Sequence, residues 1–65
     1  MTTLQSQLAN AIIDYIAGSD TVSTITSIIT EEQWNTLNAQ YRFSSDSYDQ
    51  DNDEHAIVAT EFPNL

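Results

Sequence analysis

Residues 2–18 read TTLQSQLANAIIDYIAG, and this stretch decides the N-terminal part of the fold. Apolar side chains recur in it at intervals of three and four residues, which places them on one face of a helix. Thr2, followed three residues later by Gln5, matches a capping box. Gly18, the chain's one glycine, stands where a left-handed residue ends a helix. The pattern predicts a helix over 3–17, whose apolar face holds Leu4, Leu8, Ala11, Ile12, Tyr15 and Ile16.

The segment 20–30 that follows is ambiguous between helix and strand. Val22, Ile25 and Ile29 have helical spacing, and Asp20 is a residue type that caps helices. The same segment is dense in β-branched residues, which favour strands. We prefer a short helix because strict alternation fails at the adjacent Ile28 and Ile29.

A better-marked helix is expected over 31–41. Thr30 and Gln33 form a second capping-box pattern, and Ile29 and Trp34 stand where a hydrophobic staple would form. Acidic residues fill the first turn, where the helix dipole stabilises negative charge.

Composition changes after this helix. Residues 44–54 read SSDSYDQDNDE, a polar and acidic connection with five of the ten carboxylates. Residues 55–62 read HAIVATEF, which is typical of a strand. We expect this strand to pair with residues 42–48 in a β-hairpin, and Pro63 to end it because proline cannot donate to a ladder.

The predicted fold class is therefore α+β: two to three short helices followed by a C-terminal antiparallel β-hairpin, in one small acidic domain over 1–65. An isolated hairpin is marginal in water, so it should pack on the helices or extend a sheet across a homodimer. The expected core consists of Leu4, Leu8, Ile12, Ile16, Val22, Ile25, Ile29, Trp34, Leu37, Ile57, Val58 and Phe62.

Charge is the most informative feature of the composition. Ten carboxylates face a single basic side chain, Arg42, so the net charge is −9 on 7.3 kDa. Repulsion among these carboxylates destabilises the compact state. A need for solubility, or adaptation to high salt, would explain why the chain keeps so many mutually repelling carboxylates. A third explanation, which we favour, is a negative surface that engages a positive partner.

Several classes of function are disfavoured by this composition. Direct nucleic-acid binding needs Lys and Arg at phosphates, and anionic lipid would repel the chain. The apolar stretches are too short for a membrane span, and Met1 is not followed by the basic region of a signal peptide. The chain has no cysteine. No nucleophile stands in a recognisable catalytic motif, so we expect neither an enzyme nor a cofactor.

The spacing of aspartates in the acidic connection partly matches the ligand positions of an EF-hand calcium loop. Asp49, Asp51 and Asp53 match ligand positions 1, 3 and 5 of such a loop. Glu54 stands where glycine is needed and Thr60 where the bidentate glutamate is needed. A solvated acidic loop is the better interpretation.

The remaining chemistry-bearing residues are a histidine and the aromatics. His55 is the one histidine, and zinc needs three or four ligands, so no metal site is predicted. Trp34 and Tyr15 are expected in the core. Tyr48 lies within the acidic connection, which makes it a candidate for an exposed aromatic contact.

The preferred hypothesis is a carboxylate display that imitates nucleic-acid phosphates and occupies a basic groove. In size and charge the chain resembles the small phage-encoded inhibitors of bacterial defence, the anti-CRISPR and anti-restriction proteins. The resemblance covers no specific motif and transfers no residue role. It implies a cytoplasmic location in a bacterial host and a partner that is a basic nucleic-acid-binding protein or ribonucleoprotein complex.

The alternative function is an assembly module that binds through an apolar helix face. Under the preferred hypothesis, Asp20 and Glu61 add to the electrostatic field, and the candidate partner-binding residues are Asp46, Tyr48, Asp49, Asp51, Asp53, Glu54, Glu31, Glu32 and Asp14.

Overall fold

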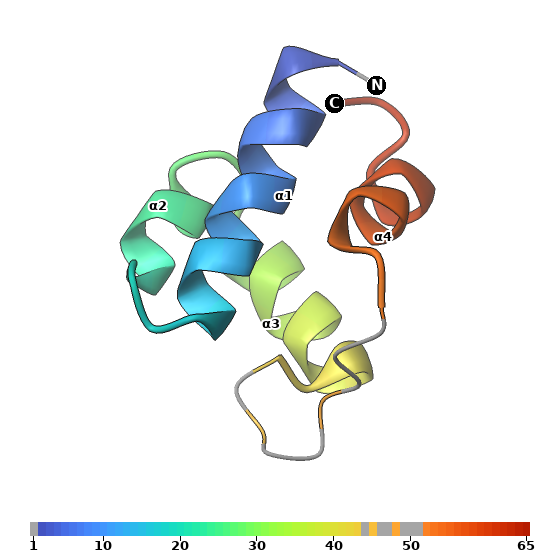
Figure 1. Ribbon diagram of the computed structural model, residues 1–65. Helices are drawn as coiled ribbons and strands as arrows, with labels where there is room; N and C mark the ends of the chain where they lie inside the picture. Colours follow the sequence, from blue (N-terminus) through green and yellow to red (C-terminus); the bar gives the residue numbers. More distant parts are fainter. Residues whose placement is uncertain (1, 44, 46–47, 49–51) are drawn as a thin grey trace.

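The computed structural model describes residues 2–43, 45, 48 and 52–65, and within these ranges every regular element is a helix (Figure 1). Four helices follow one another: α1 (Thr3–Ile16), α2 (Val22–Thr26), α3 (Glu31–Tyr41) and α4 (Glu54–Glu61). α1 contacts both α2 and α4, and α2 also contacts α3. The expected α+β class with a C-terminal hairpin is therefore wrong, and the fold is all-α.

α1 begins and ends as its sequence predicts. Thr2 accepts a hydrogen bond from the Gln5 amide at 3.1 Å, and the Gln5 side chain accepts one from the Thr2 amide at 2.8 Å. This reciprocal pair is the expected capping box. Gly18 has φ +81°, and its amide donates to the Tyr15 carbonyl at 3.1 Å. A left-handed glycine therefore ends the helix without steric cost.

The ambiguous segment 20–30 contains the short helix α2. Its N-cap is Thr21, which makes no side-chain cap hydrogen bond, so the expectation that Asp20 caps this helix is wrong. The Asp20 carboxylate instead accepts hydrogen bonds from the Thr21 amide at 2.7 Å and the Thr24 hydroxyl at 3.0 Å. α3 then opens with the expected second capping box, in which Thr30 and Gln33 exchange hydrogen bonds of 3.0 and 2.9 Å. Local polar side chains thus satisfy backbone groups that would otherwise lack partners at these helix starts.

The segment expected as a strand, 55–62, is the helix α4. Asp53 supplies its N-cap, with a carboxylate oxygen that accepts from the amides of His55 at 3.0 Å and Ala56 at 3.3 Å. Ile57 and Val58 are buried, and Phe62, one helical turn beyond Val58, packs against the same core. β-branched residues favour strands only weakly, and the cap together with one-sided burial outweighs that preference.

The expected hairpin partner, residues 42–48, does not run as an extended strand where the structure describes it. The Ser45 amide donates to the Arg42 carbonyl at 3.0 Å, and the Tyr48 amide donates to the Ser45 carbonyl at 3.1 Å. The backbone of Arg42 has a left-handed conformation, with φ +58°. The amides of Ser45 and Tyr48 therefore donate to nearby carbonyls and not to a partner strand.

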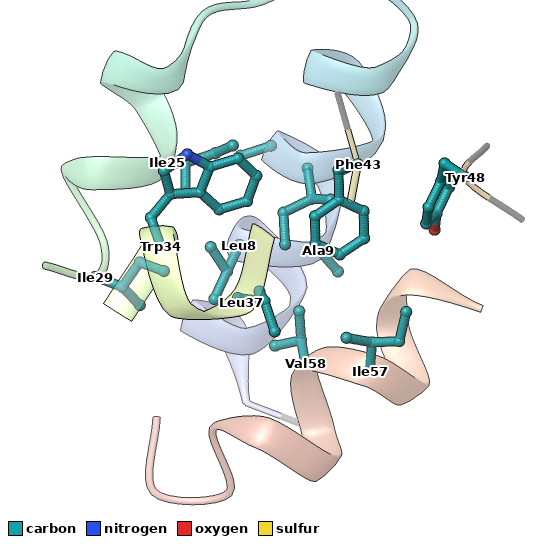
Figure 2. Close-up of a cluster of buried hydrophobic side chains, with 12 residues drawn as sticks. Leu8, Ala9, Ile25, Ile29, Trp34, Leu37, Phe43, Tyr48, Ile57 and Val58 are labelled. Carbon is teal, nitrogen blue, oxygen red and sulfur yellow. The ribbon is translucent and has the colours of Figure 1, made fainter. Parts of the chain in front are cut away.

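The core is a single cluster to which all four helices contribute (Figure 2). Trp34 stacks on Phe43 with ring centroids 5.7 Å apart and meets Tyr15 edge-on at 5.4 Å. Phe43 also contacts Tyr41 at 5.5 Å and Tyr48 at 5.0 Å. Such aromatic pairs stabilise a core beyond the area they bury, which matters in a chain of this size.

Most of the expected core residues are buried, and the exceptions have simple causes. Leu4 is 48% exposed although the next residue, Gln5, is 5% exposed, so Leu4 lies on the solvent side of the first turn of α1. Ile16, Val22 and Phe62 are only partly buried at the edge of the cluster. The expected core omitted Ala9, Phe43 and Tyr48, which are buried, and also Ala11, which the helix pattern places on the apolar face and which is buried too.

The two ends of the described chain lie side by side (Figure 1). Gln5, although polar, is only 5% exposed, and its side-chain amide donates to the Phe62 carbonyl at 2.9 Å. The Thr2 hydroxyl donates to the Leu65 carbonyl at 2.7 Å. The cap of α1 thus also holds the segment that follows α4.

Candidate binding site: the acidic surface and its grooves

Seven of the ten carboxylates belong to described residues, and they lie at the ends of the helices rather than in one cluster. Because the chain holds one basic side chain, most of them carry uncompensated charge. Five are exposed and two, Asp20 and Glu54, are half-buried. The seven are Asp14, Asp20, Glu31, Glu32, Asp53, Glu54 and Glu61.

Three of the nine predicted contact residues, Asp46, Asp49 and Asp51, lie outside the described residues. The structure therefore places six of the nine, and it separates them into three locations. The first location is the start of α3, with Glu31 and Glu32. The second is the start of α4, with Tyr48, Asp53 and Glu54. The third is near the end of α1, with Asp14.

The acidic residues at the start of α3 are available to a partner. The capping box already satisfies the backbone there, so neither carboxylate is needed as a cap. Glu31 and Glu32 are both exposed, and the dipole of α3 stabilises their negative charge.

The residues at the start of α4 are engaged within the fold instead. Tyr48 is 7% exposed, packs on Phe43, and donates its hydroxyl proton to Glu54 at 2.9 Å. The prediction that Tyr48 is an exposed aromatic contact is therefore wrong. Its neighbours in sequence are polar, but the ring of Phe43, five residues earlier, packs against it.

Asp14 and Asp20 are among the residues that line a groove between α1 and α2. The groove has a volume of about 330 Å³. Its lining residues are Gln7, Asn10, Ala11, Asp14, Asp20, Thr24, Ser27 and Ile28.

A second groove, between α3 and the C-terminal end of α4, was not predicted. It has a volume of about 410 Å³, with carboxylates from Glu32 and Glu61 and apolar surface from Leu37 and Phe62. Thr30, Gln33, Thr36 and Gln40 complete its lining. The expected strand over 55–62 would point the adjacent side chains of Glu61 and Phe62 to opposite faces, so the sequence did not predict this groove.

Glu61 is held at the edge of this groove by a tyrosine of α3. The Tyr41 hydroxyl donates to a Glu61 carboxylate oxygen at 3.3 Å. Loss of solvent around the ring raises the pKa of Tyr41 above its ordinary value, and the neighbouring charge and hydrogen bond of Glu61 raise it further. A carboxylate accepts several hydrogen bonds, so Glu61 keeps acceptor capacity toward the groove.

Metal chemistry finds no support in the described part of the chain. There, no group of three or more His, Cys, Asp or Glu side chains is placed to hold a metal ion. Asp53, the one calcium-pattern aspartate that the structure describes, uses its carboxylate to cap α4.

None of the helices in residues 2–43, 45, 48 and 52–65 has the length and apolar character needed to cross a bilayer.

Comparison of the chain with protein-family models, with curated proteins and with solved structures finds no match. Function must therefore be inferred from this chain's own residues and geometry.

Proposed function

We propose that this protein is a non-enzymatic inhibitor that binds a basic, nucleic-acid-binding surface of another macromolecule through its carboxylates. The observation that carries the proposal is the ratio of ten carboxylates to one basic side chain on a compact helical scaffold. Complementary charge speeds encounter and selects basic partners. The target class implied by the likeness to anti-defence inhibitors is a bacterial defence complex, such as a CRISPR effector, blocked where it holds DNA or RNA.

The arrangement of the helices supports this proposal in one specific way. The carboxylates of Glu31, Glu32 and Glu61 are exposed on secondary structure that is capped and packed. Rigid elements hold binding groups with less loss of entropy on association than flexible segments do. A display of this kind does not depend on the part of the acidic connection that is not described.

The alternative, an assembly module that uses an apolar helix face, has less support. The apolar face of α1 is the core, where Leu8 and Ile12 are fully buried. The exposed Leu4 and Ile13 are nine residues apart on α1. At 3.6 residues per turn this separation puts them on opposite sides of the helix. The sheet-extended homodimer also lacks a strand in the described residues.

A pull-down from bacterial lysate tests the proposal. The immobilised protein should retain nucleic-acid-binding proteins, and added DNA should displace them. Retention should weaken steeply between about 50 and about 200 mM salt, because the attraction is between charges. Recovery of only neutral or acidic partners, or retention that ignores salt, would contradict it.

A further inference from the structure

We propose that the groove between α3 and α4 receives an arginine side chain of the basic partner, which Glu32 and Glu61 hold and Phe62 flanks. This inference rests on the proposed function and names the part of the surface that makes the central contact.

The first step of the argument is the shape of the groove. Its volume of about 410 Å³ falls within the range of about 300–1,000 Å³ that is usual for sites binding small groups. A neighbouring hollow of about 240 Å³ shares Gln33, Glu61 and Phe62 with it and continues along residues 63–65. The depression therefore accommodates a side chain together with part of the segment that carries it.

The second step is charge complementarity. Both ionisable side chains in the groove lining are carboxylates, and neither Arg42 nor His55 contributes to it. Glu61 is braced by Tyr41, and Glu32 lies in the first turn of α3, where the helix dipole stabilises its charge. A cation is therefore the ligand that this groove fits.

The third step distinguishes arginine from lysine. The groove combines carboxylates with apolar surface from the half-buried Phe62; Leu37 also lines it but is only 2% exposed. A guanidinium group pairs with carboxylates through two parallel hydrogen bonds and stacks on aromatic faces. A lysine ammonium is a compact, strongly hydrated point charge that uses the apolar surface less well.

The test is a two-dimensional NMR titration of the full ¹⁵N-labelled chain with an acetylated tetra-arginine peptide. The side-chain amide signals of Gln33 and Gln40, which line the groove, should shift. An acetylated tetra-lysine peptide should bind more weakly. Equal affinity for the two peptides would remove the arginine assignment.

Matched double variants locate the binding. Glu32→Gln with Glu61→Gln removes two charges inside the groove and should lower the affinity for the arginine peptide about tenfold. Asp20→Asn with Asp53→Asn also removes two charges, but both residues lie outside this groove and serve as hydrogen-bond acceptors at helix starts, a role that asparagine keeps. This control should lose less than about threefold, because neither charge contacts a peptide in the groove. Thermal melts of both variants check that the fold is retained.

The outcomes separate this inference from the proposed function. Equal losses in the two double variants, or no shift of Gln33 and Gln40, would overturn the groove assignment while leaving salt-sensitive capture of basic proteins intact. Failure to capture basic proteins from lysate would instead overturn the proposed function itself.

Discussion

The carboxylates of α3 and of α4 differ in what they contact, although both helices begin with acidic residues. In α3 the cap is a neutral threonine and glutamine pair, so Glu31 and Glu32 stay exposed. In α4 the cap is itself a carboxylate, Asp53, and the next residue, Glu54, accepts the Tyr48 hydroxyl. The carboxylates of α3 are therefore available to a partner, whereas those of α4 serve as the cap and as the acceptor for Tyr48.

The difference divides the acidic surface into two functional parts. Substitutions at the start of α4 should reduce folding stability, because its carboxylates hold the helix and Tyr48. Substitutions at the start of α3 should alter binding and leave folding almost unchanged. The predictions that follow test this division.

The largest effect is expected at Phe43, the aromatic residue that links the end of α3 to Tyr48 and so to α4. It is 3% exposed and contacts Trp34, Tyr41 and Tyr48. Phe43→Ala should lower the free energy of unfolding by about 3–5 kcal/mol, the usual cost of removing a buried aromatic ring. Chemical denaturation followed by near-UV circular dichroism measures this.

The matched control for Phe43 is an apolar residue at the surface. Ile13 is 36% exposed on α1, so Ile13→Ala should cost less than about 1 kcal/mol. A small domain has a total stability of only about 0.05–0.15 kcal/mol per residue, and Phe43→Ala is therefore expected to leave much of the population unfolded. A folded Phe43→Ala protein with an unchanged midpoint would show that the aromatic cluster is not central.

The next effect concerns the hydrogen bond between Tyr48 and Glu54. Tyr48→Phe keeps the ring against Phe43 but removes the donor to the Glu54 carboxylate. We expect a loss of about 1–2 kcal/mol, since hydrogen bonds to charged groups are the stronger ones. Glu31→Gln at the start of α3 should cost less than about 0.5 kcal/mol. Equal losses in the two variants would remove the distinction between α3 and α4.

A smaller effect distinguishes the role of Asp53 as a helix cap from the role of its negative charge. Asp53→Ala and Thr30→Ala each remove an N-cap and should each cost about 1 kcal/mol. Asp53→Asn retains an equally good cap, so its stability should stay near that of the original chain. If Asp53→Asn also binds basic partners as before, Asp53 acts in folding alone; a large loss of affinity would return it to the binding surface.

The bounds of α1 and the start of α3 were the most predictable parts of the fold. Thr2 with Gln5, Thr30 with Gln33, and Gly18 are local signals, because each acts on backbone groups within a few residues. They required no knowledge of the rest of the chain. For the same reason the bounds of α1 and α3 agree closely with the ranges 3–17 and 31–41.

α4 and the groove were not predicted, because they depend on contacts distant in sequence. The run of Ile57 and Val58 resembles a strand, and Asp53 was interpreted as part of the acidic surface rather than as a cap. Helix formation there follows from burial of Val58, which is fully inaccessible, in the shared core. Tyr48 was misplaced because its polar sequence neighbours do not reveal that it packs on Phe43, five residues before it, and donates to Glu54, six residues after it.

The smallest effect is a dependence of stability on alkaline pH that Tyr41 and Glu61 produce together. The pKa of Tyr41 is raised above the ordinary tyrosine value of about 10, chiefly by loss of solvent and then by Glu61. The folded chain therefore keeps this phenol proton at a pH where the unfolded chain has lost it. The stabilisation is complete below the unfolded pKa and is lost as pH rises through the folded pKa.

Denaturation midpoints at about pH 9 and about pH 11, on either side of the ordinary tyrosine pKa, should fall more for the original chain than for Tyr41→Phe. Glu61→Gln should bring the Tyr41 pKa back toward its ordinary value in an ultraviolet titration, because it removes the nearby charge. An identical pH response in all three proteins would mean that Tyr41 does not hold Glu61, and the groove would lose the contact that fixes one of its two carboxylates.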